Sequence, residues 1–181
     1  MEREDALKLI ESKIKNKNLI RHMLAVEVCM RKLAKIFGED IEKWGLAGLL
    51  HDVDYEETKE DFSRHGIVAE ELLKREGVSP DIIEAIKAHP GHILRKSKIA
   101  KALYAVDALT GLIVASALMH PERSLEALDV KFVLNRFKEK SFARGADREQ
   151  IKSCQELGLE LEEFVRICLE AMKEIHNDLG L

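Results

Sequence analysis

Residues 98–119 read KIAKALYAVDALTGLIVASALM and form the longest apolar run of the chain. Within it, Asp107 shares one helical stripe with Leu103, Val114 and Leu118, at spacings of four and seven residues. The run contains several polar residues and lacks flanking aromatic belts, which argues against a membrane span. We therefore predict that it is the buried central helix of a helical core and that the protein has no membrane partner.

The rest of the chain has the same helical periodicity. No alternating apolar pattern reaches the quality of a strand, and proline occurs only at positions 80, 90 and 121. The predicted fold class is all-α, with a single domain over residues 1–181, a core at about 18–115 and C-terminal helices at about 128–179. The expected helices cover approximately 4–15, 18–37, 40–52, 63–76, 79–89, 98–119, 130–137, 148–157 and 161–178, and a charged loop covers 53–62.

Composition limits the cellular setting and the partners. The 181 residues include 29 Lys and Arg against 33 Asp and Glu, and the net charge of −4 argues against a surface for a nucleic-acid polymer or an anionic membrane. Cys29, Cys154 and Cys168 are odd in number and far apart, which argues against a disulfide framework. The first five residues are too charged for a signal peptide. We expect a cytoplasmic protein; composition leaves its oligomeric state open.

Polar side chains occur where a helical core is expected. His22 begins the apolar stripe of the second helix, and the pair His51-Asp52 ends the apolar third helix. An unpaired buried carboxylate such as Asp107 costs several kcal/mol. The alternatives are a core histidine bonded to a carbonyl, polar residues at a helix end, and a distant arginine paired with Asp107. A divalent cation held by two imidazoles and two carboxylates would compensate the free-energy cost of burying all four side chains. This donor set fits Fe, Mn, Co, Ni or Zn.

Further residues are candidates for the same centre. His65 and His89 lie at helix ends that face it if the helices form a bundle, and His92 is a third candidate. Arg95, Lys98 and Lys101 surround the start of the 98–119 helix and are predicted to bind substrate phosphate. Basic residues between 138 and 148 are an additional candidate group, although such charges more often form a solvated face.

Three local sequences give the chain a family resemblance. They are RHMLAVE at 21–27, LAGLLHDVD at 46–54 and AVDAL at 105–109. In this order they resemble the HD superfamily of metal-dependent phosphohydrolases. The resemblance implies an all-α fold around a central metal, with His22, His51, Asp52 and Asp107 as ligands of one ion.

The resemblance also extends to members of the family that hold two metals. His65 and His89 look like the additional ligands of such members, in which Asp52 would bridge both ions. The implied cofactor is therefore a divalent transition metal, as one or two ions. Val53-Asp54 stands where many relatives have Ile-Gly, and the Gly-Tyr-Pro motif of the cyclic-dinucleotide branch is missing.

The implied activity is hydrolysis of a phosphate ester or anhydride by metal-activated hydroxide. We expect a small phosphorylated substrate, a nucleotide by preference, and no nucleic-acid polymer. Asp52 and Asp54 are the predicted catalytic residues, and Asp54 would orient the attacking water or protonate the leaving group. Two other hypotheses are a di-iron oxygenase of the same superfamily and a non-catalytic nucleotide-binding module.

Overall fold

The computed structural model describes residues 1–181, and all of its regular elements are helical, which confirms the predicted all-α class. The elements are α1 (Arg3–Lys13), α2 (Lys17–Phe37), α3 (Ile41–Leu50), α4 (Tyr55–Thr58), the 3-10 helix η1 (Phe62–Arg64), α5 (Ile67–Arg75), α6 (Pro80–Ala88), α7 (Lys98–Met119), α8 (Val130–Lys138), α9 (Arg148–Lys152), the 3-10 helix η2 (Ser153–Leu157), α10 (Leu161–Glu174) and α11 (His176–Leu179).

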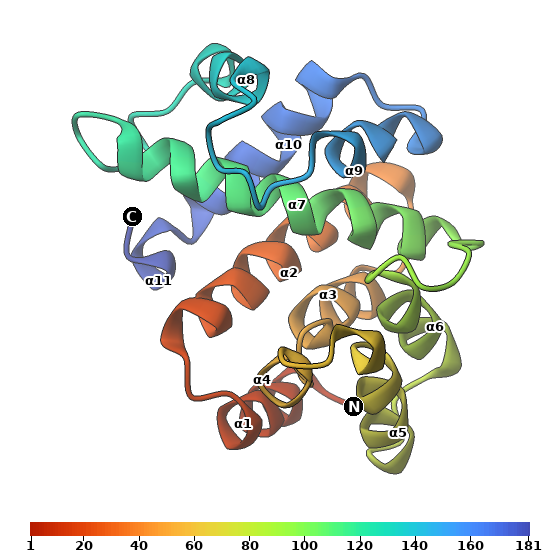
Figure 1. Ribbon diagram of the computed structural model, residues 1–181. Coiled ribbons are helices and arrows are strands. Elements are labelled where there is room, and N and C mark those ends of the chain that lie inside the picture. The colour runs from red at the N-terminus through yellow and green to blue at the C-terminus, as the bar shows by residue number, and fades with distance from the viewer.

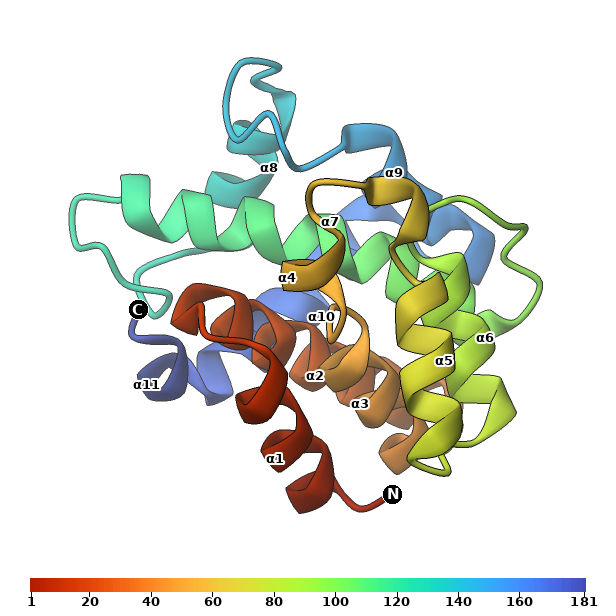
Figure 2. The ribbon, with the colours of Figure 1, turned by 60° about the horizontal axis from the view of Figure 1, so that its bottom comes forward.

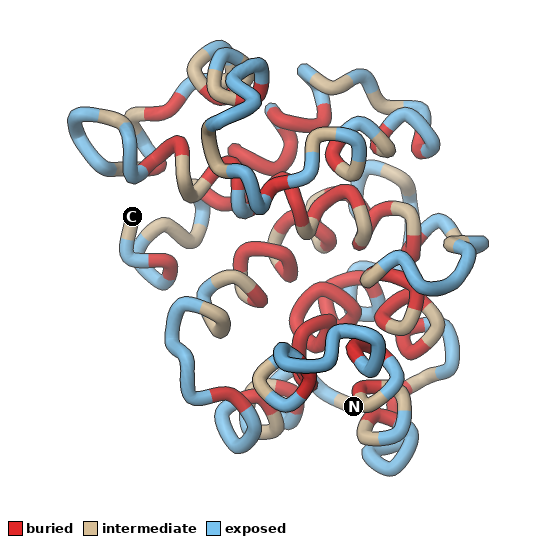
Figure 3. The backbone as a smooth tube through the Cα atoms, viewed as in Figure 1, coloured by how far each residue is buried: buried red, intermediate tan, exposed pale blue.

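Helices α2 and α7 form the middle of the bundle (Figure 1). On one side of this pair, α3 packs along α2 and also contacts α6 and α7, while α1 covers α3 and α5 covers α6. On the other side, α8, α9 and α10 pack on α7, and α10 also contacts α2. Buried residues concentrate along α2, α3 and α7 (Figure 3), so the core lies where these helices meet.

Helix α7 has an apolar surface that the other helices cover. By length and composition it is the one helix of the chain that could cross a membrane, and 61% of its most apolar window is buried inside the bundle. Leu103, Leu109 and Leu112 are fully buried. The structure therefore uses α7 as the core helix that its sequence predicted.

The helix ends near His51, Asp52 and His65 differ from the predicted ones. Helix α3 ends at Leu50, so His51 and Asp52 lie in the turn that follows it. The predicted helix start at Ser63 was wrong, because Gly66 adopts a left-handed conformation with φ of 80° and α5 begins only at Ile67. The charged loop contains the short helix α4 (Figure 2).

The C-terminal third contains more breaks than its periodicity indicates. The helix predicted at 148–157 divides into α9 and the 3-10 helix η2, and the final helix breaks at Ile175 before α11. The segment between α8 and α9 has no regular structure and crosses α7 (Figure 1). This segment borders the candidate site described below.

Helices α2 and α3 approach each other closely at Gly48. A Cβ atom built on Gly48 would lie 2.9 Å from the backbone N and Cα of Glu27 and 2.9 Å from the carbonyl oxygen of Val26. These are backbone atoms and cannot rotate away. The absence of a side chain at Gly48 therefore sets the distance between the two helices that carry His22 and the His51-Asp52 turn.

We expect Gly48→Ala to lower the free energy of unfolding by about 1–3 kcal/mol, because the added methyl group overpacks a backbone contact. Gly111→Ala in α7 is the matched control, since a Cβ there meets nothing within 4 Å. That control is expected to raise stability by about 0.5–1 kcal/mol through helix propensity. Urea denaturation of both variants measures the difference, and equal stabilities would contradict the close approach.

Candidate metal centre

Six polar residues from distant parts of the sequence meet inside the bundle. They are His22 on α2, His51 and Asp52 after α3, His65 before α5, His89 at the end of α6 and Asp107 in the middle of α7. His51, Asp52, His65 and His89 are buried, whereas the side chains of His22 and Asp107 are 25% and 27% exposed. The structure thus brings together all six residues that the sequence predicted as metal ligands.

The partly exposed residues form one end of the cluster, which we call the open end. His22 Nε2 lies 3.1 Å from Asp107 Oδ1 and 3.2 Å from His51 Nε2. Asp52 Oδ2 lies 3.3 Å from His51 Nε2 and 3.8 Å from His22 Nε2. Four donor atoms therefore face a common point between α2, α3 and α7.

The opposite end of the cluster is closed to solvent. His65 Nε2 lies 3.1 Å from His89 Nε2. The other carboxylate oxygen of Asp52, Oδ1, lies 3.2 Å from His65 Nε2 and 3.5 Å from His89 Nε2. Asp52 therefore turns one oxygen to each end, which is the arrangement of a bridging carboxylate.

The spacing and the chemistry of these donors fit divalent transition metals. Donors at about 2.1 Å from an ion lie about 3.0–3.4 Å from each other in octahedral or tetrahedral geometry, and the separations above fall close to that range. No lysine or arginine forms an ion pair with Asp52 or Asp107, whose charged partners are all histidines. By contrast, the buried carboxylate of Glu27 is paired with Arg3 and Arg31. The alternative of a distant arginine at Asp107 is therefore excluded.

All four imidazoles turn Nε2 inward and hold Nδ1 outward. Nδ1 of His51 is 2.8 Å from the carbonyl oxygen of Gly48, and Nδ1 of His89 bonds in the same way to Ile86. Because a carbonyl only accepts, Nδ1 carries the proton in both rings and donates it. The neutral form of each ring then has its free electron pair on Nε2, directed at the centre.

Asp54 has a different position from the predicted one. Its side chain is fully buried; Oδ1 lies 2.8 Å from Nδ1 of His65, and Oδ2 accepts from the backbone N–H of Gly66 and of Ala69, both at 2.9 Å. Both oxygens are hydrogen-bonded inside the fold and the side chain is fully buried, so Asp54 is not exposed to a ligand that enters from solvent. These contacts make Asp54 a residue that orients His65 and caps α5, and its predicted catalytic role stays a prediction.

The carboxylates control the charge of the buried histidines. Burial lowers the pKa of His51, but Asp52 and Asp107 outweigh it and raise that pKa to about 9. Burial acts likewise on His65, and its bonds to Asp52 and Asp54 raise its pKa to about 9. Burial raises the pKa of Asp52, yet the neighbouring histidines bring it well below its ordinary value. Asp52 therefore remains ionised at neutral pH and makes the pocket attractive to cations.

The predicted phosphate-binding cations do not reach the cluster. Lys101 pairs with Glu156 at 3.6 Å, and Lys98 lies 3.4 Å from Glu39. The guanidinium of Arg95 stacks on the ring of Tyr104, with 3.7 Å from Cζ to the ring centroid. Their role in substrate binding stays a prediction. His92 also lies outside the cluster, because its Nε2 is bonded to the carbonyl of Phe62.

Two polar neighbours of the centre were missed from the sequence. Gln150 Nε2 donates to the carbonyl of Tyr104 at 2.8 Å and lies 3.4 Å from Asp107 Oδ2. Thr110 Oγ1 lies 3.3 Å from Nδ1 of His22. Glutamine is rare in this chain, which has it only at positions 150 and 155, and this rarity is the one signal that could have drawn attention to Gln150.

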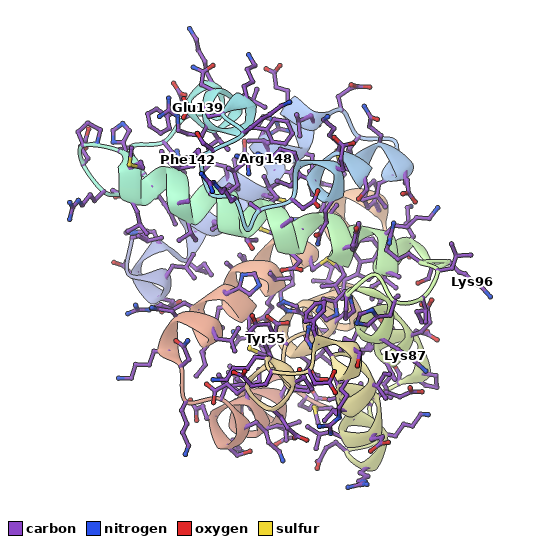
Figure 4. The ribbon with its side chains drawn as sticks, in the orientation of Figure 1. Tyr55, Lys87, Lys96, Glu139, Phe142 and Arg148 are labelled. Carbon is purple, nitrogen blue, oxygen red and sulfur yellow. The ribbon has the colours of Figure 1, made fainter.

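The open end faces several cavities. His22 lines three of them, with volumes of about 310, 430 and 630 Å³. The cavity of about 310 Å³ is also lined by Asp107 and Gln150. The cavity of about 630 Å³ is bordered by Tyr55, which Figure 4 labels, and the ring of Tyr55 packs edge-on against that of His65. A ligand therefore reaches the centre past His22 and Asp107.

Comparison with known proteins agrees with this geometry. The model of the HD domain family matches residues 19–132. Ribonuclease Y from Nitratidesulfovibrio vulgaris (strain DP4) is 32% identical over 96 residues, which cover 53% of this chain and 18% of that protein. Ribonuclease Y from Enterococcus faecalis is 28% identical over 165 residues, 90% of this chain and 32% of that protein. No solved structure gives a significant match.

The helical fold and the six-residue centre define a metal-dependent hydrolase. More particularly, the chain belongs to the HD domain family. It spans less than a third of the length of these curated relatives. Their name states an action on RNA, which contradicts the predicted partners, a small phosphorylated substrate with no nucleic-acid polymer. That prediction relied on net charge, which averages over the whole surface and misses local groups of cations.

We expect Asp54→Asn to weaken metal binding at the closed end by about 10- to 100-fold. The amide oxygen can still accept from Gly66 and Ala69, but its NH2 group then faces Nδ1 of His65. This contact favours the tautomer with the proton on Nε2, which removes the electron pair from the centre. Metal titration followed by elemental analysis measures the loss. Asp61→Asn, an exposed substitution nearby, is the control, and wild-type affinity in Asp54→Asn would contradict the role.

Metal binding should release protons at neutral pH. Because the pKa values of His51 and His65 are raised to about 9, both rings are protonated at pH 7 and must lose a proton before Nε2 can bind. We expect His51 and His65 together to release about two protons at pH 7, their release to fall toward zero above pH 9, and the affinity for metal to rise over the same interval. Calorimetry in buffers of different ionisation enthalpy measures the release. Identical heats in all buffers at pH 7 would contradict the raised pKa values.

Proposed function

We propose that the chain is a metal-dependent phosphohydrolase that cleaves phosphodiester bonds of RNA and holds two divalent ions when active. The observation that carries the proposal is the division of the cluster into two ligand groups that share Asp52. The similarity to proteins named ribonuclease Y supports RNA as the substrate. The presence of two carboxylates and four imidazoles without thiolates supports ions of the Fe, Mn, Co, Ni or Zn series.

The residues of the centre have separate tasks in this proposal. When bound, a divalent cation lowers the pKa of a coordinated water and polarises a phosphoryl oxygen. Asp52 contributes one carboxylate oxygen to each ligand group and so sets their relative position. The carbonyl oxygens of Gly48 and Ile86 fix the orientation of the His51 and His89 rings. The buried side chains exclude bulk solvent from the closed end, so the scissile phosphate enters at the open end beside His22 and Asp107.

We also propose that residues 1–181 fold as one cytoplasmic domain. Helices α8, α9 and α10 pack on α7, and α10 and α11 contact α2, so the C-terminal third is attached to the two helices that carry His22 and Asp107. Limited proteolysis that cuts the chain between 115 and 130 and leaves a metal-binding N-terminal fragment would contradict the single domain.

We expect Asp107→Ala to reduce metal-dependent hydrolysis of a labelled single-stranded RNA by about a thousandfold or more, because it removes a ligand from the open end. The metal-loaded wild type should also cleave bis(p-nitrophenyl) phosphate, and a chelator should stop both reactions. Asp81→Ala, an exposed carboxylate on α6, is the matched control and should keep wild-type kcat/KM.

Initial rates with both substrates, under anaerobic conditions and in air, provide the measurement. Unchanged activity in Asp107→Ala, or no hydrolysis by metal-loaded wild type, would contradict the proposal. Consumption of oxygen without release of a phosphodiester product would indicate oxygenase chemistry instead.

A further inference from the structure

We propose that the segment between α8 and α9, residues 139–147, together with the end of α8, binds the phosphate backbone of a single-stranded RNA and directs the strand into the open end. The inference deepens the proposed function and rests on it. Its basis is a rigid loop that carries unpaired cations and forms a wall of the cavity beside Asp107. We call this segment the α8–α9 loop.

Arg148 holds the loop in one conformation. Its guanidinium donates to the carbonyl oxygens of residues within and just before the loop: Arg136, Phe137, Glu139, Phe142, Ala143 and Ala146. Figure 4 shows Glu139, Phe142 and Arg148 close together. Since all five N–H groups of a guanidinium are used in this way, Arg148 organises the backbone and is not free for a phosphate.

The loop backbone has one unusual conformation. Ala143 adopts φ of 45°, in the left-handed region that is uncommon for residues other than glycine. Backbone strain of this kind occurs most often at functional sites, where the surrounding structure imposes it. Here the carbonyl of Ala143 is itself bonded to Arg148, so the same hydrogen bonds hold the strained residue in place.

Three cations of this region have no acidic partner. Lys138, Lys140 and Arg144 are exposed, and none of them forms an ion pair. They line a cavity of about 510 Å³ together with Arg148 and Lys152. Two carboxylates also line this cavity, but Asp147 accepts from two backbone amides of α9 and Glu149 pairs with Lys152. The free charge of the cavity is therefore positive.

The cationic cavity adjoins the metal centre. Ala146 lines both this cavity and the one of about 310 Å³ that contains His22, Asp107 and Gln150. Gly111 and Gly145 also line the second cavity, and a Cβ at either would meet nothing within 4 Å. The space beside Asp107 is thus bordered by small residues, and the loop forms its wall on the cationic side.

A flexible polyanion fits this arrangement better than a duplex. Only about a quarter of the side chains of His22 and Asp107 is exposed, so a phosphodiester must bend inward to reach them. The cations are long and exposed, and the cavity offers no exposed aromatic ring for base stacking. We therefore expect contacts with phosphates, independent of base sequence.

The test measures binding of a 12-nucleotide 2′-O-methyl RNA, which resists cleavage, by fluorescence anisotropy with metal-loaded protein. The loop variant replaces Lys138, Lys140 and Arg144 with glutamine. The control variant replaces Lys13, Lys35 and Arg75, which are also two lysines and one arginine, exposed and without an ion pair. Both variants change net charge equally, so they separate a local effect from that of the overall field.

We expect the loop variant to bind at least tenfold more weakly and the control variant to stay within twofold of wild type. The dependence of log Kd on log salt concentration should decrease by about 0.7 for each phosphate that the loop variant no longer neutralises. Thermal melting and bound metal per chain verify that the loop variant is folded. Equal weakening by both variants, or no binding by wild type, would overturn the inference, and so would loop-dependent binding of duplex RNA as tight as that of the single strand.

This outcome is distinguishable from failure of the proposed function. Binding of the uncleavable RNA requires no turnover, so wild-type binding by the loop variant, together with RNA hydrolysis by the wild type, overturns the loop alone. Absence of hydrolysis by metal-loaded wild type overturns the proposed function, even where the RNA binds at the loop.

Discussion

The structure depends on two carboxylates, one buried and one about a quarter exposed, that have no lysine or arginine beside them. Asp52 and Asp107 instead face four imidazoles, and the six side chains come from five different segments of the chain. Such an arrangement is stable only when positive charge is present, supplied by protons on the histidines or by bound metal. The packing of α2, α3, α6 and α7 brings the donor atoms about as close together as the ligands of one metal ion. Because folding creates this arrangement, the stability of the core depends on the charge at its centre.

The sequence predicted His22, His51-Asp52 and Asp107 as candidate ligands because they interrupt the apolar pattern around them, whereas His65 and His89 were predicted from their places at helix ends and from the family resemblance. Asp107 interrupts the most hydrophobic helix, and His51-Asp52 follows a run of leucine and alanine. The helical class followed from periodicity in the same way. Helix boundaries were less predictable, because they depend on local backbone states such as the left-handed Gly66. Since that residue delays α5 until Ile67, it leaves His65 in an extended conformation from which the ring reaches Asp52.

What could not be predicted has a common physical origin, which is that sequence reveals a residue's type but not what it contacts. Asp54 has the chemistry of a general base, yet its oxygens are occupied by His65 and by two backbone amides. Lys98 and Lys101 have the charge to bind phosphate, and their pairing with glutamates far away in the sequence is visible only in the structure, while their role in substrate binding stays a prediction. Net charge had the same weakness, because it counts paired and unpaired cations alike.

The unequal exposure of the two ends has a consequence for exchange with solvent. A cation at the end formed by His65 and His89 has no direct route outward, since both rings are buried and the only exposed ligands belong to the other end. It can leave only after its neighbour, or when the turn before α5 opens. The two positions should therefore exchange metal at different rates. During dialysis the ion at the His65–His89 end is lost last, and on reloading it is the first to bind stably.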